Sequence, residues 1–127
     1  MDKSDLPFQT IVTLSSLIKS REVSPVDLTA AFLERISTVD SKINSYITVC
    51  ADRAMASAKA SEQLLANNNY LGPLHGIPYA IKDQFWTKGI QTTAGSNLLK
   101  NFMPKEDSTV IEKMNFAGTI LLGKLNL

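Results

Sequence analysis

The sequence of 127 residues contains one cysteine and one histidine. Cys50 therefore has no partner for an intramolecular disulfide, and one cysteine with one histidine cannot supply a structural zinc site. We expect no metal or organic cofactor. Proteins of reducing compartments commonly lack disulfide cysteines, so we expect a cytoplasmic protein.

Long hydrophobic runs and an excess charge of one sign are also missing. Thirteen basic and 12 acidic residues give a net charge of +1, and no Lys/Arg run creates a local positive field, so nucleic-acid binding by this segment is not predicted. Hydrophobic residues make up 44% of the chain without a bilayer-length stretch, which indicates a globular piece and no membrane partner. Residues 1–9 carry Asp2 and Asp5 and do not resemble a secretory signal.

The first half, residues 1–70, is predicted to be mainly helical and to end in a polar asparagine tract. Ser24 and Pro25 have the form of a helix start, with serine as the cap and proline at the first helical position. This helix is expected to run towards Val39, since four apolar residues form one stripe along it: Leu28, Phe32, Ile36 and Val39. Thr13 is a candidate cap for a shorter helix before it.

Two further elements are predicted before the asparagine tract. Residues 46–49 are rich in β-prone side chains and indicate a strand. Residues 51–66 are rich in alanine and other strong helix formers and contain no internal breaker. A short strand followed by a long helix is therefore expected.

The second half, residues 71–127, is predicted to form a strand, a loop, a helix and a second strand. The apolar run 76–82 is short enough for a buried strand, in which Pro78 must lie near the first residue or on an unpaired side. A helix then opens at 107–108 and ends near Gly118, before a buried strand over 119–122. The fold class is therefore α/β: a helix-rich amino-terminal half followed by part of a mixed, helix-covered sheet, within one incomplete domain spanning 1–127.

Lys82 is the candidate catalytic residue. It ends the first of these strands, and ligands gather beyond the carboxyl ends of strands in such sheets. A lysine held by a rigid strand in apolar surroundings can lose its charge by desolvation and act as a base. The alternative is a solvated lysine paired with Asp83, and the residues by themselves favour that alternative.

Other polar and aromatic side chains near Lys82 are expected to be structural. His75 has no spaced partner, so a structural hydrogen bond is the better interpretation. Thr92, Thr93 and Ser96 stand in a loop, where hydroxyls more often satisfy backbone groups. Aromatic burial alone accounts for Trp86, and Cys50 is expected to be inert.

Four motifs together resemble the amidase signature family. They are Gly72-Pro73-Leu74-His75-Gly76-Ile77-Pro78-Tyr79-Ala80-Ile81-Lys82-Asp83, Thr87-Lys88-Gly89, Thr92-Thr93-Ala94-Gly95-Ser96 and Gly123-Lys124-Leu125-Asn126. The resemblance covers nearly the whole chain, and the segment around Lys82 is its most specific part. It implies an incomplete α/β/α amidase fold.

The resemblance also implies a mechanism. The family cleaves carboxamides with a serine nucleophile, a second serine in a cis peptide and a lysine, and that lysine falls on Lys82. A neutral lysine takes a proton through the bridging serine, the nucleophilic serine attacks the amide carbonyl, and an acyl-enzyme forms as ammonia or an amine leaves. Both serines would lie beyond Leu127.

One stretch departs from the family pattern. Gln84, Phe85 and Trp86 stand where the family commonly has a small polar residue and an aliphatic-polar stretch. The aromatic pair bears on the identity of the carboxamide substrate more than on the chemistry. Leu125 replaces a frequent threonine or alanine, a change expected to be harmless.

Three functions remain open from the sequence. The first is the amino-terminal portion of an amidase, inactive alone, and the second is the A subunit of a tRNA amidotransferase, which releases ammonia from glutamine. The third is a truncated, non-catalytic interaction module. The weakness of the module is an apolar sheet edge expected after the last strand, which the rest of an amidase polypeptide or another chain would have to cover.

Overall fold

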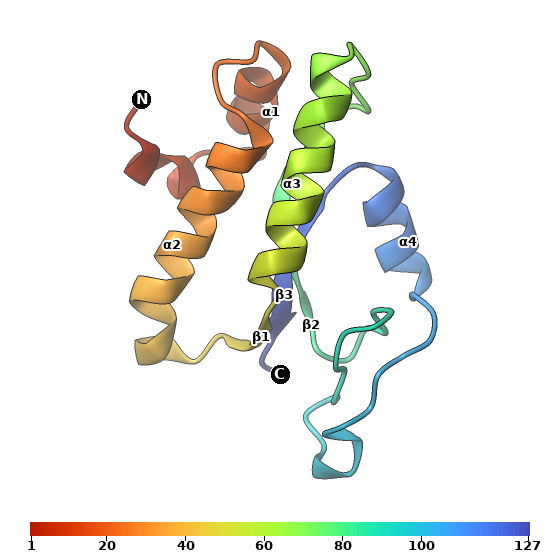
Figure 1. Ribbon diagram of the computed structural model, residues 1–127. Helices are drawn as coiled ribbons and strands as arrows, with labels where there is room; N and C mark the ends of the chain where they lie inside the picture. Colours follow the sequence, from red (N-terminus) through yellow and green to blue (C-terminus); the bar gives the residue numbers. More distant parts are fainter.

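The computed structural model describes all residues, 1–127, as a set of helices packed beside a small sheet (Figure 1). The elements follow one another as η1 (Lys3–Phe8), α1 (Ile11–Lys19), α2 (Pro25–Ile43), β1 (Tyr46–Val49), α3 (Ala51–Ala66), β2 (Pro78–Lys82), η2 (Asn97–Leu99), α4 (Thr109–Phe116) and β3 (Ile120–Leu125). The mixed α/β class predicted from the sequence is confirmed. No helix is long and apolar enough to cross a membrane.

The long helix α2 begins where its residues predict. The Ser24 side chain accepts a hydrogen bond from the backbone N–H of Asp27, and Pro25 occupies the first turn. The helix continues past Val39 to Ile43 and ends because Asn44 adopts the left-handed conformation, with φ 51°.

The prediction that Thr13 caps the short helix was wrong. Thr10 is the cap of α1, and its hydroxyl accepts a hydrogen bond from the backbone N–H of Thr13, which lies inside the helix. Both threonines can accept such a bond, but Thr10 stands three residues before the N–H that it caps, which is the spacing a cap requires.

The sheet has three strands in the order β1-β3-β2. β1 runs antiparallel to β3, whereas β2 runs parallel to it, so the sheet is mixed as predicted. The parallel pair requires a crossover, which the loop after β2 and helix α4 provide. Pro78 is the first residue of β2, the position where a missing N–H does least harm to the ladder.

The last strand is central and not an edge. β3 pairs on both sides, and β1 and β2 form the two edges. The expectation of an unpaired edge at the final strand was therefore wrong, because a strand late in the chain can insert between two earlier ones. The uncovered edges belong to the outer sides of β1 and β2.

Helices α2 and α3 lie side by side against one face of the sheet (Figure 1). Two small residues of α3, Ala54 and Ala58, pack against Ile120 and Leu122 of β3 and bring the helix close to the strand. A second cluster joins α1, α2 and the end of α3 to the residue that precedes β2. Its members are Leu6, Leu14, Ile18, Leu28, Leu65 and Ile77. The two clusters therefore join the helices to β3 and to the residue that precedes β2.

Candidate active site

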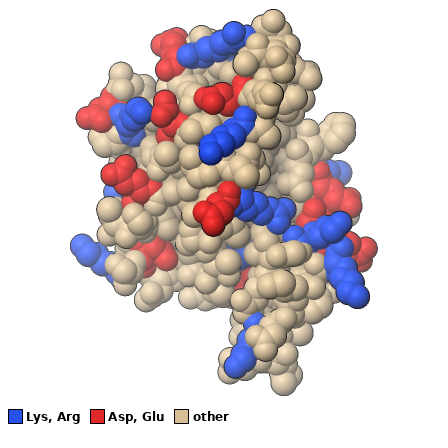
Figure 2. All heavy atoms as spheres, in the orientation of Figure 1, with Lys and Arg blue, Asp and Glu red and all other residues tan.

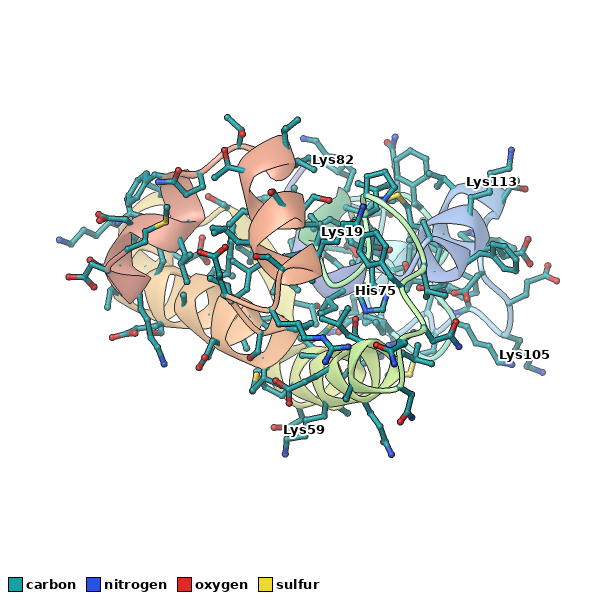
Figure 3. All side chains as sticks on the ribbon, turned by 90° about the horizontal axis from the view of Figure 1, so that it is seen from above. Lys19, Lys59, His75, Lys82, Lys105 and Lys113 are labelled. Atoms are coloured by element: carbon teal, nitrogen blue, oxygen red, sulfur yellow. The ribbon has the colours of Figure 1, made fainter.

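Lys82 is the last residue of β2, as the sequence predicts. The strand itself is half-buried, but the side chain of Lys82 is exposed and lies on the side of the molecule away from α3 (Figure 3). Its amine donates a hydrogen bond to the backbone carbonyl of Asn126 at 3.0 Å. The strand therefore presents Lys82 next to the chain segment that follows β3.

Lys82 lies outside the main surface hollows of the chain. Three surface hollows of about 350, 210 and 340 Å³ lie along η1 and α2, between α2 and α3, and beside α3 and α4, and Lys82 lines none of them. Its carbonyl instead accepts the backbone N–H of Phe85 at 3.2 Å, which closes a tight turn after the strand.

Asp83 is not the partner of Lys82. Lys82 is exposed, whereas the side chain of Asp83, the first residue of the turn after β2, is 0% exposed. One carboxylate oxygen of Asp83 lies 3.6 Å from the amine of Lys124, whose side chain is also 0% exposed. The alternative interpretation of Lys82, a solvated lysine paired with Asp83, is therefore wrong in its pairing.

Lys124 is the residue that the sequence analysis missed. Its amine donates to the carbonyl of Phe85 and to the hydroxyl of Thr92, each at 2.8 Å. Burial lowers the pKa of this lysine, and the charge of Asp83 opposes that shift. A lysine inside the apolar run 120–125 was a usable signal, because a charged side chain in a buried strand needs an acidic partner.

The loop hydroxyls are structural, as predicted. Thr93 donates to Asp83 through both its backbone N–H, at 3.0 Å, and its hydroxyl. Thr92 accepts the bond from Lys124, and the Ser96 side chain accepts the backbone N–H of Leu98 at the start of η2. All three side chains satisfy buried or backbone groups within the loop that follows β2.

His75 is also structural. Its ring is completely buried between α3 and the loop before β2 (Figure 3). The backbone N–H of Leu71 donates to Nδ1 at 3.2 Å, so Nε2 carries the proton and donates to the carbonyl of Ser61 at 2.9 Å. Both ring nitrogens are used, which leaves none for catalysis.

Trp86 is exposed and not buried, so the burial expected from the sequence does not account for it. Trp86 packs its edge against Phe102, with ring centroids 5.4 Å apart, and remains about half exposed. Cys50 lies half-buried before α3, and burial raises the pKa of its thiol. No group of three or more metal-ligating side chains is present.

Comparison with known proteins gives the family of this chain. Residues 27–127 match the Amidase family. The chain belongs to the amidase family. This match includes the two strands that carry Lys82 and Lys124, and it confirms the resemblance to amidase signature proteins found in the sequence.

Several similar relatives within the family are amidotransferase subunits. The chain is 44% identical over 124 residues to the A subunit of the glutamyl-tRNA(Gln) amidotransferase of Acidothermus cellulolyticus, covering 98% of this chain and 25% of that protein. It is 47% identical over 117 residues to the corresponding protein of Geobacter sulfurreducens, covering 92% and 24%. The chain therefore spans about a quarter of the length of these relatives.

Solved amidase structures share the fold. The native peptide amidase of Stenotrophomonas maltophilia superposes with a TM-score of 0.89 at 30% identity, covering 94% of this chain and 25% of that one. The arrangement of helices around β1, β2 and β3 is therefore the arrangement found in one part of an amidase.

Proposed function

We propose that this chain supplies one part of an amidase-type enzyme that hydrolyses the C–N bond of carboxamides, and that Lys82 is its catalytic base. Membership of the amidase family supports the reaction class. The position of Lys82 supports the role: it ends a strand held on one side by β3, inside the segment most typical of the family.

The mechanism needs two serines that these residues do not supply. In the proposed Ser-cisSer-Lys arrangement, Lys82 accepts a proton through the bridging serine of the cis peptide, and the nucleophilic serine attacks the amide carbonyl. Because the chain spans a quarter of its relatives, we expect residues outside it to provide both serines and to cover the exposed amine. By itself, the 127-residue chain is expected to be inactive. A cytoplasmic location and an organisation as one incomplete domain stay predictions.

The amidotransferase component is the favoured form of this enzyme. Identity to the A subunits is 44–47%, against 30% for the peptide amidase. Such a component would release ammonia from glutamine and pass it to an acyl acceptor on another polypeptide. The free-standing amidase is the second candidate, and the non-catalytic interaction module is the third.

The proposal can be tested in a chimeric protein, called here the joined enzyme, in which residues 1–127 of this chain replace the aligned residues of the Acidothermus cellulolyticus protein. Ammonia release by the joined enzyme is measured with glutamine and with simple carboxamides. Lys82→Ala is expected to reduce turnover by at least about 100-fold, the usual contribution of a general base. Lys59→Ala, which removes an exposed lysine of α3, is the matched control and should leave turnover unchanged (Figure 3).

The outcomes separate the candidates. Glutamine turnover that depends on Lys82 supports the amidotransferase component, whereas turnover of simple carboxamides alone supports a free-standing amidase. Full activity in the Lys82→Ala enzyme would remove Lys82 from the mechanism. A joined enzyme that folds but turns over neither substrate would favour the interaction module.

A further inference from the structure

The turn that follows Lys82 contains a buried ionic network. Asp83 and Lys124 have fully buried side chains and form the only buried ion pair of the chain, at 3.6 Å. The second carboxylate oxygen of Asp83 accepts two hydrogen bonds from Thr93, and Lys124 donates to Thr92 and to the carbonyl of Phe85. Buried charges held by an opposite charge and by hydrogen bonds have little freedom to move.

This network connects three segments around the end of β2. Lys124 comes from β3, Asp83 and Phe85 come from the turn after β2, and the two threonines come from the loop 90–96. Backbone hydrogen bonds reinforce the same junction: the N–H of Asp83 donates to the carbonyl of Leu125 at 3.0 Å, and the N–H of Ala94 donates to the carbonyl of Asp83 at 2.9 Å. Lys82 lies directly before this junction.

The ion pair also directs the charge of Asp83 away from Lys82. An aspartate next to a lysine in sequence would favour the protonated amine if the two side chains met. Here the side chain of Lys82 is exposed, whereas that of Asp83, in the turn after β2, is buried beside the cation of Lys124. The amine of Lys82 has a backbone carbonyl as its partner instead.

We propose that Asp83 and Lys124 are positioning residues that fix the end of β2 against β3 and the loop 90–96, and so set the place of the Lys82 amine. This proposal rests on the proposed role of Lys82 as the base. Neither residue takes part in the chemical step. Their contribution is geometric, and a displacement of about 1 Å of a catalytic group can cost about 100-fold in rate.

Hydrogen exchange of the 127-residue chain tests the rigidity of the junction and needs no enzymatic turnover. Two variants remove the network: Asp83→Asn, which keeps the shape of the side chain, and Lys124→Met, which keeps its length. We expect exchange in peptides covering residues 83–94 to accelerate at least about tenfold more than in peptides from α2, because the opening is local. The double variant, which leaves no unpaired buried charge, should show the same local change if either single variant fails to fold.

A core variant provides the control for general destabilisation. Leu14→Ala removes buried side-chain volume from the cluster that joins α1 and α2, which includes none of the residues of the junction. It is expected to accelerate exchange in α2 as much as in residues 83–94. If the Asp83 and Lys124 variants show this uniform pattern, the positioning proposal is overturned.

Kinetics of the joined enzyme test the consequence for catalysis. Asp83→Asn is expected to lower kcat by at least about tenfold with little change in KM, because substrate binding does not use the junction. Leu14→Ala should leave kcat nearly unchanged. Lys124→Arg, which retains a cation, should recover more of kcat than Lys124→Met.

The two proposals fail in different ways. An active Lys82→Ala enzyme would overturn the base role, and with it the catalytic purpose of the junction, whatever the exchange data show. An inactive Lys82→Ala enzyme with unchanged kcat in Asp83→Asn would overturn the positioning role alone.

Discussion

Lys82 and Lys124 occupy neighbouring strands at the same end of the sheet but have opposite environments. In the register of β2 and β3, Lys82 lies beside Leu125, and Lys124 lies beside Ile81. The first lysine is exposed, and the second is completely buried with Asp83. A sequence pattern treats these two side chains alike, because both follow an apolar run. The difference between the two lysines comes from packing, which buries Lys124 and thereby lowers its pKa.

Lys124 should give the stability of the chain a characteristic pH dependence. Its folded pKa is lowered from 10.5, so at pH values between the two the unfolded state binds more protons, and the unfolding free energy rises with pH. We expect the wild type to gain stability relative to Lys124→Met as the pH rises towards 10.5. Urea unfolding of both proteins at a series of pH values measures this difference.

The variant is the necessary reference for that measurement. Cys50, Tyr46 and Tyr79 have pKa values raised by burial, and each contributes in the opposite direction in the same alkaline range. The contributions of the two tyrosines are common to both proteins and cancel in the difference, whereas the charge of Lys124 itself lowers the pKa of Cys50, so that effect remains part of the difference. A difference that falls with pH would show that Lys124 keeps its proton more tightly in the folded chain than in the unfolded one.

Local sequence signals decide where single helices and strands begin, whereas close contacts between elements decide how they pack together. Helix α2 begins at a serine cap that its own residues define, and β1, α3 and α4 lie where their composition predicts them. The cap of α1 was misjudged because two threonines stand near its start, and the choice depends on a spacing of only three residues. By contrast, no pattern within a short stretch of sequence predicts the contact between β1 and β3.

Ser24→Ala tests the start of α2. The side chain accepts the N–H of Asp27, and its loss should lower the free energy of unfolding by about 0.5–2 kcal/mol. Ser37→Ala, at an exposed position inside the same helix, is the control and should be neutral or slightly stabilising, since alanine is the better helix former. Equal losses in the two variants would contradict a capping role.

Gly123→Ala tests the contact between β1 and β3. A Cβ at this position would overlap the backbone carbonyl oxygen of Thr48 and lie 2.9 Å from a ring carbon of Tyr46. We expect a loss of about 1–3 kcal/mol and faster exchange at the N–H of Cys50, which donates to the carbonyl of Leu122.

A second glycine gives the comparison for that variant. Gly89→Ala meets no atom within 4 Å and carries only the cost of a left-handed residue, with φ 71°. It should leave exchange at Cys50 unchanged. If Gly123→Ala also leaves that exchange unchanged, β1 can move away from β3 without losing the strand pair.

For the whole molecule, the two sheet edges decide how the chain behaves alone. β1 and β2 each have one unpaired side, and on β1 the exposed positions are Ile47 and Val49. Charges of both signs are interspersed over the face shown in Figure 2, so no strong field of one sign keeps copies apart. Apolar, unpaired strands without repulsion are prone to association.

We therefore expect the 127-residue chain to be oligomeric or poorly soluble in size-exclusion chromatography. Placing lysines at the two exposed positions of β1, in the variant Ile47→Lys/Val49→Lys, should shift the protein towards a monomer, because charged edge strands resist pairing. A wild-type chain that elutes as a stable monomer at every concentration would contradict this expectation.

Local sequence signals were sufficient to predict the α/β class, the helix and strand segments, the family and the position of Lys82 at the end of a strand. These features depend on periodicity, caps and motifs that lie within short stretches of chain. The central place of β3 and the pairing of Asp83 with Lys124 instead of Lys82 were visible in the folded chain alone. Both features depend on which distant segments lie side by side and in which register. The packing of the whole chain sets this arrangement, and the residues adjacent in sequence do not.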